Sequence, residues 1–477
     1  MSLKFGTSGL RGLSVDLKGE ATALYVTAFA QTLLESGRAR PGDPVFVGRD
    51  FRDSSPEIAA TSFGALARAG FSPVDCGTVP TPALALYAMS RKAAAIMITG
   101  SHIPADRNGI KFYRPDGEID KQDEAAISAR AAALESDSAA LDATPGTGED
   151  AAIAVMELFC TRNHVILPDN ALSGMRIGVY QHSTVARDLF VEILGHYGAG
   201  VVPLGRSETF IPVDTEAVST QTIALLKGWA TEHGLDAIVS ADGDGDRPLV
   251  ADETGEPLRG DLLGLIAAKF LKARVVVTPV TSNSGLEKAG GFAVRRTKVG
   301  SPFVIAGMYE ALAAGETGVM GFEANGGLLT ACEFAVHGGT LAALPTRDSL
   351  LPVLAVLSQA AEARKPLSEV AAAYRLHVAD ADRLEHFPAE KSAALMAYLR
   401  KSPANLAAFL KTIGAVSQTS DIDGLRITLT DGRIIHLRPS GNAPEMRCYV
   451  EAQTPEAAKA VLKQGLDLIR NWGGGAV

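Results

Sequence analysis

Residues 237–248 have the sequence AIVSADGDGDRP, in which a short apolar run leads into three aspartates that alternate with glycines. The run 237–241 carries no charge and has a length typical of a strand that is buried on both faces. Glycine permits backbone conformations that other residues avoid, so the chain after this strand can turn tightly and bring alternate carboxylates together. The stretch therefore predicts an α/β domain in which a buried strand ends in an acidic loop, where such domains commonly bind ligands.

The acidic loop, residues 242–247, contains Asp242, Asp244 and Asp246. At about 4 Å and an effective dielectric constant of about 20, each close pair of carboxylates costs on the order of 4 kcal/mol. A divalent cation such as Mg²⁺, which takes oxygen ligands, would turn this repulsion into binding. A solvated acidic turn is the simplest alternative. A calcium loop that ends at Glu253 is another, but Arg247 stands where that loop requires glycine.

The order of strand, polar turn, helix and strand occurs three times along the chain, beginning near residues 45, 176 and 274. Each repeat later reaches an apolar strand that runs into a polar loop containing glycine. These strand-to-loop segments are residues 96–102, 237–246 and 318–326. Alternating strands and helices are typical of parallel sheets with crossover helices. We therefore predict three similar α/β domains with mixed, largely parallel sheets.

The pattern changes from about residue 370 onward. A helical stretch is followed by hairpin strands at 425–429 and 434–437, a strand at 447–451 and a final helix at 455–469. Antiparallel strands packed against helices are typical of a smaller α+β domain. Segments with linker composition lie at residues 142–150 and 363–367. The predicted domains are residues 1–148, 149–257, 258–368 and 369–477.

Composition narrows the class of partner. The 477 residues include 45 basic and 54 acidic side chains, a net charge of −9 that does not suit a protein that coats nucleic acid or an anionic membrane. The four cysteines form no C-x-x-C pair, so neither a zinc site nor a disulfide framework is indicated. The chain shows no secretory signal and no apolar run long enough to span a membrane. We expect a cytoplasmic protein with reduced thiols and with no nucleic-acid or membrane partner.

The segment TGSHIPADRNGIKFY, residues 99–113, places Ser101 at the end of a predicted strand. A hydrolase nucleophile elbow would need glycine at positions 99 and 103, which are Thr99 and Ile103. Acyl transfer is therefore disfavoured. A serine near a metal held by carboxylates could instead carry a phosphoryl group. A purely structural turn is the alternative for this segment taken alone.

The segment RPSGNAPEMR, residues 438–447, offers groups that bind phosphate. Two guanidinium groups, two polar side chains and backbone N–H groups around a glycine surround a turn between two strands. A solvated surface turn is the alternative. The candidate phosphate ligands are Arg438, Ser440, Gly441, Asn442 and Arg447.

Together these segments resemble the α-D-phosphohexomutase superfamily over essentially the full length of the chain. Four motifs match in the family's order: TSGLRG at residues 7–12, TGSHIPADRNGIKF at 99–112, DGDGDR at 242–247 and RPSGNAPEMR at 438–447. GFEANGG, residues 321–327, stands where the family has its sugar-binding loop. The resemblance implies four domains around a central cleft and an enzyme that is phosphorylated on serine. It also implies bound Mg²⁺, a hexose phosphate substrate and a hexose 1,6-bisphosphate intermediate.

The resemblance also implies a role for each candidate residue. Ser101 would carry the phosphate and complete a metal site with the three aspartates, and His102 and Lys111 would transfer protons. We expect the pKa of Lys111 to be lowered by a nearby cation and an arginine. The residues that would bind substrate are Arg11, Arg247, Lys298, Glu323, Asn325, Arg438, Ser440, Gly441, Asn442 and Arg447.

Several positions depart from the commoner family pattern. Gly100 and Ile103 replace Ala and Asn beside the serine, and Asn325 replaces the usual serine of the sugar loop. Asn442 and Ala443 replace Thr and Glu in the phosphate loop. The FEANGG form and the stretch PTRDSLLP, residues 345–352, resemble a bacterial branch of phosphomannomutases. We expect that activity, with phosphoglucomutase, phosphoglucosamine mutase and a non-catalytic divalent-cation-binding protein as alternatives.

Overall fold

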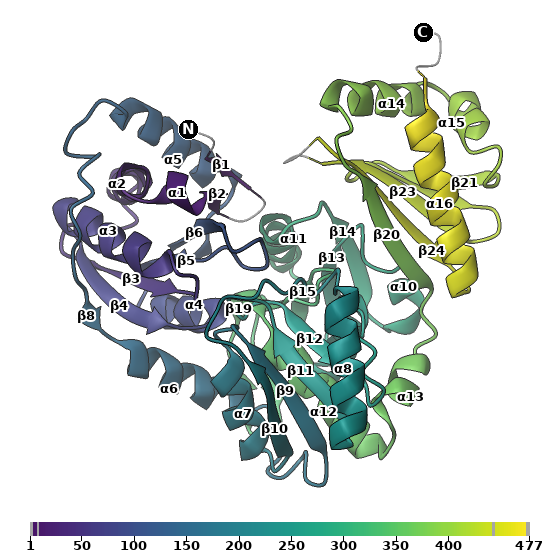
Figure 1. Cartoon of the computed structure of the whole chain (residues 1–477), viewed down its shortest axis with the longest axis horizontal. Helices are drawn as coiled ribbons and strands as arrows, with labels where there is room; N and C mark the ends of the chain where they lie inside the picture. Colours follow the sequence, from purple (N-terminus) through teal and green to yellow (C-terminus); the bar gives the residue numbers. More distant parts are fainter. Residues whose placement is uncertain (1–2, 7–8, 441–443, 474–477) are drawn as a thin grey trace. The chain divides into compact units, whose positions relative to one another are not determined.

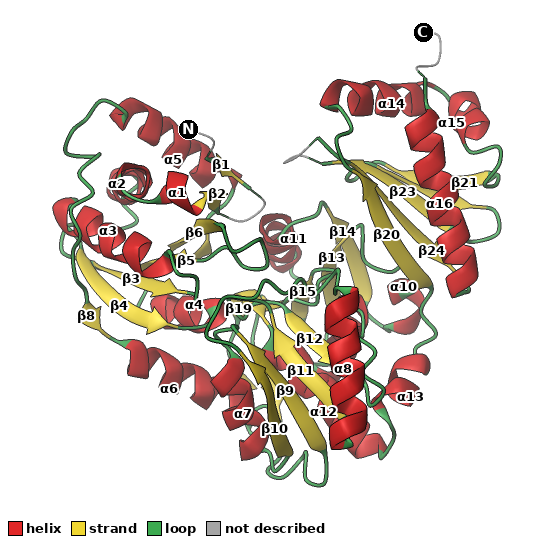
Figure 2. Cartoon of the chain, in the orientation of Figure 1, coloured by secondary structure: helices red, strands yellow, loops and turns green. Residues whose placement is uncertain are grey.

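The chain forms two compact units in the computed structural model, which describes residues 3–6, 9–440 and 444–473. The first unit is Met1–Val276 with Gly300–Ala373, and the second is Val277–Val299 with Tyr374–Val477. Figure 1 labels the elements of each unit and Figure 2 shows that helices and strands alternate through most of the first. No helix in the described ranges is long and apolar enough to cross a membrane.

The N-terminal sheet has the strand order β1-β2-β6-β5-β3-β4-β8, and β7 pairs with β6. Strands β4 and β5 are parallel to β3, whereas β6 is antiparallel to β5. Helices α2, α3 and α5 pack together on one face, and α4 and α6 on the other. The strands are β1 (Lys4–Phe5), β2 (Leu10–Leu13), β3 (Pro44–Arg49), β4 (Ser72–Thr78), β5 (Ala94–Ile98), β6 (Arg107–Arg114), β7 (Gly117–Glu118) and β8 (Glu149–Asp150).

The helices of this region begin with α1 and end with α6. Apolar side chains of α2, α3 and α5 line one face of the sheet and form a core with buried residues of β3 and β5. The rings of Phe29 and Phe112 lie 4.7 Å apart in this core. The helices are α1 (Ser14–Leu17), α2 (Glu20–Glu35), α3 (Ser55–Arg68), α4 (Thr81–Ser90), α5 (Lys121–Leu134) and α6 (Ala152–Asn163).

The second sheet has the order β10-β9-β11-β12. Strands β9, β10 and β11 are parallel, and β12 is antiparallel to β11, so the acidic loop connects two neighbouring antiparallel strands. The elements are β9 (Arg176–His182), α7 (Arg187–His196), β10 (Gly200–Arg206), α8 (Thr220–His233), β11 (Ala237–Ala241) and β12 (Pro248–Ala251). In these two regions the predicted mixed α/β sheets are confirmed, with antiparallel strands placed beside a parallel core.

The rest of the first unit contains an antiparallel group of strands, β15, β16 and β19, and a small hairpin of β17 and β18. Helices α9 and α12 pack against each other. The elements are α9 (Gly260–Phe270), α11 (Ser301–Ala313), β15 (Val319–Phe322), β16 (Leu328–Thr330), β17 (Phe334–Val336), β18 (Gly339–Leu341), β19 (Leu344–Asp348), α12 (Leu350–Ala363) and α13 (Leu367–Ala372).

The second unit contains an antiparallel sheet with the order β20-β24-β23-β22-β21. Helix α16 packs on β20, β23 and β24, and the predicted α+β domain is confirmed. β13 (Val275–Pro279) carries the chain from the first unit into the second, where α10 (Leu286–Ala289) and β14 (Ala293–Thr297) follow. The C-terminal elements are β20 (Val378–Leu384), α14 (Ala389–Lys401), α15 (Pro403–Phe409), β21 (Val416–Ser420), β22 (Leu425–Leu429), β23 (Ile434–Pro439), β24 (Met446–Ala452) and α16 (Pro455–Asn471).

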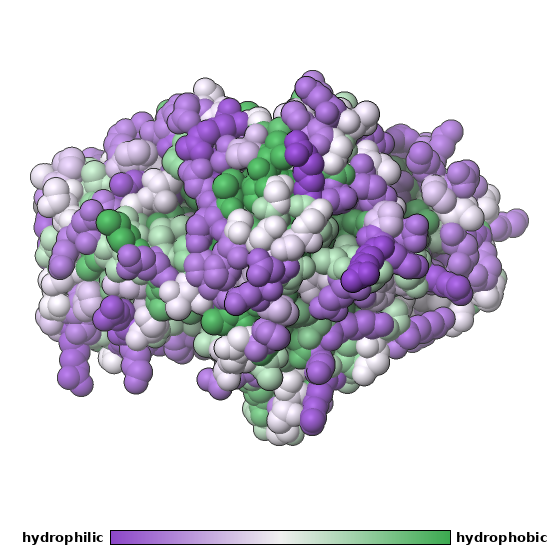
Figure 3. All heavy atoms as spheres, turned by 90° about the horizontal axis from the view of Figure 1, so that it is seen from below, coloured by the Kyte–Doolittle hydropathy of each residue, from purple (hydrophilic) through white to green (hydrophobic). Residues whose placement is uncertain are grey.

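The surface is mostly polar on the face drawn in Figure 3, where apolar residues occupy smaller areas between charged ones. Large exposed apolar side chains in the described ranges include Val15 and Ile153. Most apolar side chains instead lie in the cores between helices and sheets. These cores fix the ends of β5 and β11, from which the candidate site is built.

Candidate functional site

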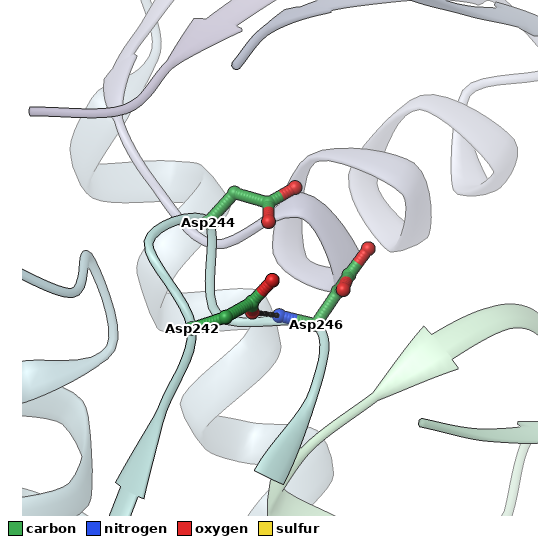
Figure 4. A group of neighbouring side chains, drawn as sticks. All are labelled: Asp242, Asp244 and Asp246. Carbon is green, nitrogen blue, oxygen red and sulfur yellow. Dashed lines mark hydrogen bonds between the residues drawn. The ribbon is translucent and has the colours of Figure 1, made fainter. Parts of the chain in front are cut away.

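The acidic loop is held by its own backbone. The N–H groups of Asp246 and Arg247 donate to Oδ1 of Asp242 at 3.1 Å each, and Gly245 takes a φ of 71° in the turn. All three aspartate side chains are fully buried, and one oxygen of each lies within 4.8 Å of the others. Figure 4 shows the three carboxylates on one loop between β11 and β12. The sequence prediction that these carboxylates come together is therefore correct.

Buried cations balance the acidic loop. The Nζ atom of Lys111 donates to Oδ2 of Asp244 at 2.5 Å and to Oδ2 of Asp246 at 2.7 Å. The guanidinium of Arg347 donates to Oδ2 of Asp246 at 2.8 and 3.0 Å. Because all these groups are buried, their charges interact strongly, and each carboxylate depends on its neighbours for stability.

Asp242 and Asp246 differ in proton affinity. Burial raises the pKa of Asp242 well above its usual value, and the charges of Asp244 and Asp246 raise it further. Burial also acts against ionisation of Asp246, but Arg347 and Lys111 outweigh it and hold its pKa below the usual range. Within the described residues, Oδ1 of Asp244 and Oδ1 of Asp246 have no hydrogen-bond partner. Unpaired buried oxygens in an all-oxygen donor set fit a hard divalent cation such as Mg²⁺.

Ser101 lies beside the acidic loop. It belongs to the serine loop, residues 99–107, which follows the buried strand β5, and its hydroxyl donates to Oδ2 of Asp242. Its backbone adopts a left-handed φ of 54°, an uncommon conformation for a residue with a side chain. The side chain is 1% exposed. The structure therefore places the predicted nucleophile in contact with the predicted metal site.

His102 lies next to the Ser101 hydroxyl, with its Nδ1 atom 3.2 Å from Oγ of the serine. The same Nδ1 atom is 2.9 Å from a guanidinium nitrogen of Arg247. Burial and the positive charge of Arg247 together lower the pKa of His102 to about 3. The imidazole is therefore neutral near pH 7, and its Nδ1 can accept a hydrogen bond.

The surroundings of Lys111 raise its pKa, whereas a lowered pKa was expected from the sequence. It lies on β6, which is antiparallel to β5, and its side chain is almost completely buried. Burial acts to lower its pKa, but the carboxylates of Asp244 and Asp246 outweigh burial and raise the pKa. The two carboxylates contact the ammonium directly and so oppose the lowering that a nearby cation and an arginine were expected to cause. Lys111 is thus a charged partner of the acidic loop.

The predicted sugar-loop residues follow β15. Both Glu323 and Asn325 are 5% exposed. Oδ1 of Asn325 accepts from the N–H of Gly327 at 3.0 Å, which fixes the loop. Glu323 accepts from Arg347 at 3.0 Å, so Arg347 connects the sugar loop to the acidic loop. Arg347 was not among the predicted site residues, although it lies in the stretch PTRDSLLP.

Two further contacts were also missed. Thr81, the first residue of α4, donates its hydroxyl to Oδ2 of Asp244 at 2.6 Å. Its N–H donates to the backbone oxygen of the same aspartate at 2.9 Å. No motif marks a threonine 163 positions away in the sequence as a partner of that aspartate.

Arg11 on β2 was predicted, and burial together with Arg247 and Arg347 lowers its pKa to about 10.

The second unit holds the remaining predicted residues. Arg438 and Arg447 are opposite each other on β23 and β24, and the N–H of Ser440 donates to the oxygen of Glu445 at 2.9 Å. Gly441 and Asn442 lie outside the described residues. Asp423 accepts from Nε of Arg438 at 2.9 Å. It also accepts from the N–H of Val299 at 3.0 Å, immediately after the exposed Lys298.

The fold and the site define a class of protein: an α/β protein in which a buried serine contacts an acidic cluster suited to a divalent cation. Four family models match successive parts of the chain. Those for the phosphoglucomutase/phosphomannomutase alpha/beta/alpha domains I, II and III match residues 2–138, 161–255 and 259–376. The model for the C-terminal domain matches residues 376–467. The chain belongs to the phosphoglucomutase/phosphomannomutase family.

Individual relatives cover almost the whole chain. It is 57% identical over 471 residues to a phosphomannomutase of Sinorhizobium fredii (strain NBRC 101917 / NGR234), with 99% of each chain covered. It is 40% identical to a phosphomannomutase of Salmonella muenchen, with 98% of this chain and 96% of the relative covered. A crystal structure of a provisionally assigned phosphomannomutase from Thermus thermophilus superposes with a TM-score of 0.75 at 25% identity, covering 99% of this chain and 100% of that one.

Proposed function

We propose that the chain is a phosphomannomutase, which reversibly transfers phosphate between O6 and O1 of mannose phosphate. The contact between Ser101 and Asp242 carries this proposal, because it joins a hydroxyl that can be phosphorylated to a cluster suited to a cation. The two relatives that match nearly the full chain at 57% and 40% identity are named phosphomannomutases and support the choice of sugar.

In this proposal Ser101 carries a phosphoryl group that is transferred to a hydroxyl of the sugar monophosphate. The bond between phosphorus and the serine oxygen breaks, a bond to the sugar oxygen forms, and a hexose 1,6-bisphosphate results. The other phosphate of that bisphosphate then returns to Ser101, which leaves the isomeric monophosphate. His102 is the candidate acceptor of the sugar hydroxyl proton, because its Nδ1 atom lies 3.2 Å from the serine hydroxyl.

The acidic loop and Ser101 would hold Mg²⁺. The three aspartates supply oxygen ligands, two of which accept no hydrogen bond within the described ranges. When bound, the ion would stabilise the negative charge of the phosphoryl group during transfer. Lys111 pairs with the carboxylates of Asp244 and Asp246, and Arg347 holds Asp246 in place. We assign these residues to positioning and charge balance.

Substrate binding is assigned to residues of both units. Glu323 and Asn325 would accept and donate hydrogen bonds to sugar hydroxyls, and Arg11 and Arg247 would balance the charge of the substrate. The arginines of the phosphate loop, residues 438–447, would hold the phosphate that does not react. In the second unit the residues assigned to substrate are Lys298, Arg438, Ser440, Gly441, Asn442 and Arg447.

The domain boundaries and the cellular compartment are proposed from the sequence. We propose four domains, residues 1–148, 149–257, 258–368 and 369–477. Cys76, Cys160, Cys332 and Cys448 are free thiols, which supports a reducing compartment, and we place the protein in the cytoplasm. Because the net charge is −9, an anionic sugar phosphate must bind through local positive charge. The basic side chains of the site would supply that charge.

The test is an assay of purified protein with Mg²⁺ and a catalytic amount of glucose 1,6-bisphosphate. The substrates are the 6-phosphates of mannose, glucose and glucosamine, and formation of each 1-phosphate is measured. We expect the highest kcat/KM for mannose 6-phosphate and no turnover by Ser101→Ala. A preference for glucose or glucosamine phosphate would reassign the sugar, and turnover of none of the three would contradict the proposed function.

A further inference from the structure

Arg52 makes an unusual number of contacts with the serine loop. Its two terminal nitrogens donate to four backbone oxygens of that loop, and its Nε donates to Asp50 at 3.2 Å. Every N–H of the guanidinium is thus engaged, and the side chain is 1% exposed. The four acceptors are the oxygens of Ser101 at 3.0 Å, Ile103 at 2.6 Å, Pro104 at 2.7 Å and Arg107 at 2.8 Å.

Asp50 fixes the beginning of the same loop. It accepts from the hydroxyl of Thr99 at 2.8 Å and from the N–H of Gly100 at 3.3 Å. Gly100 makes room for the arginine, because a Cβ atom at this position would lie 2.6 Å from Cζ of Arg52. This packing accounts for glycine at a position where the family more commonly has alanine. Asp50 and Arg52 together therefore hydrogen-bond to residues on both sides of Ser101, whose backbone is left-handed.

Arg52 also contacts the region that carries the acidic loop. Its guanidinium lies 4.0 Å from the ring centroid of Phe210, which follows β10. The ring of Phe210 packs on Gly243 of the acidic loop, where a Cβ atom would lie 2.9 Å from it. A second pair runs in the opposite direction, because Arg187 of α7 lies 4.2 Å from the ring centroid of Phe51. Neighbouring residues 51 and 52 thus each form a cation–π pair with the second sheet region.

We propose that Arg52 is a positioning residue that holds the serine loop against the acidic loop and so keeps Ser101 in reach of Asp242, and that its neighbour Phe51 supports it through the contact with Arg187. This inference rests on the proposed role of Ser101. Neither side chain is assigned to the sugar, the phosphate or the cation. Loss of the contacts is therefore expected to slow phosphoryl transfer without weakening substrate binding, because reacting groups displaced by about 1 Å lose roughly 100-fold in rate.

The first test replaces Arg52 by glutamine and measures kcat and KM for mannose 6-phosphate. We expect kcat to fall by about 100-fold with KM unchanged. Arg52→Lys is expected to recover little, because one ammonium cannot reach four carbonyl oxygens. The matched control is Arg433→Gln, which removes an arginine bonded to Asp431 and to the oxygen of Ile413 in the second unit. Its kcat is expected to equal that of the unchanged protein.

The second test uses Phe210→Leu, which keeps an apolar side chain but removes the ring, and therefore remains informative if Arg52→Gln does not fold. A cation–π pair of this kind corresponds to about a two- to thirty-fold effect on an equilibrium or rate. We expect kcat of Phe210→Leu to fall within that range. In the double variant with Arg52→Gln, the two losses should not multiply, because both variants break the same contact.

The third readout is independent of the sugar. The rate at which Ser101 gains phosphate from glucose 1,6-bisphosphate is followed by mass spectrometry in the unchanged protein and in each folded variant. Slower phosphorylation of Arg52→Gln and Phe210→Leu supports positioning even if another hexose proves to be the preferred substrate. Unchanged kcat and unchanged phosphorylation in both variants would overturn the inference, as would a rise in KM with kcat retained.

Discussion

Lys111→Met removes the buried ammonium from the acidic loop while keeping a side chain of similar length. In the structure this ammonium contacts one oxygen of Asp244 and one of Asp246, at 2.5 and 2.7 Å. After the change Asp244 keeps the hydroxyl of Thr81, and Asp246 keeps the guanidinium of Arg347. The acidic loop then holds three buried carboxylates with one fewer positive charge.

The expected loss of stability follows from burial. Breaking a buried ion pair by removing one partner costs about 3–5 kcal/mol, because an unbalanced charge remains inside the protein. For domains of this size each kcal/mol lowers the Tm by about 2–4 °C, so the Tm of the metal-free protein should fall by roughly 6–20 °C. Mg²⁺ should reduce this loss, since a cation at the carboxylates replaces the missing positive charge.

The assay is thermal unfolding of Lys111→Met and of the unchanged protein, each with a chelator and with excess Mg²⁺. Lys227→Met is the matched control, because Lys227 and its partner Glu256 are both about half exposed. Its free energy of unfolding should change by about 1 kcal/mol or less. A Tm of Lys111→Met equal to that of the unchanged protein without metal would refute the charge balance described for the acidic loop.

Three further outcomes are expected. Thr81→Val removes a hydroxyl that orients Asp244 and should weaken Mg²⁺ binding by about 10- to 100-fold in calorimetry, whereas unchanged affinity would argue against an oriented ligand. Burial opposes ionisation of Glu451, but hydrogen bonds from His377 and Ser284 outweigh it and lower its pKa to about 2. The ionised carboxylate therefore contributes about 3 kcal/mol to the free energy of unfolding above pH 4.5, and this contribution is lost as the pH falls toward 2. In denaturant titrations Glu451→Gln should be less stable than the unchanged protein at pH 7 and equally stable near pH 2. Arg438→Ala should lower kcat/KM by about 10- to 150-fold while Ser101 is still phosphorylated, and an unchanged kcat/KM would remove the phosphate role from this arginine.

The parts of the fold that depend on local pattern could be predicted from the sequence. The uncharged run 237–241 became β11, and the strand predicted at 425–429 became β22 with the same bounds. Strand β20, Val378–Leu384, was missed and its region was expected to be helical. Its sequence VADADRL has no apolar alternation, because the strand lies at the edge of its sheet and its residues are partly buried or exposed.

The site was predictable where residues of one loop act together. The three aspartates are close in sequence, and their mutual repulsion alone indicates a shared ligand. Arg52, Thr81 and Arg347 could not be found in this way, because each lies far in sequence from the site residues that it contacts and reaches them only through tertiary packing. The contacts of Lys111 with Asp244 and Asp246, which raise its pKa, could not be foreseen for the same reason, since the sequence does not show which charges a buried side chain touches.

Phosphorylation of Ser101 tests the central claim most directly. The protein is incubated with Mg²⁺ and glucose 1,6-bisphosphate, digested, and mapped by tandem mass spectrometry, with Ser101→Ala treated in parallel. We expect one phosphate on Ser101, its loss when excess sugar monophosphate accepts it, and no phosphate on the alanine variant. Full turnover by a protein that carries no phosphate on Ser101, or transfer through a phosphate on another residue, would contradict the account.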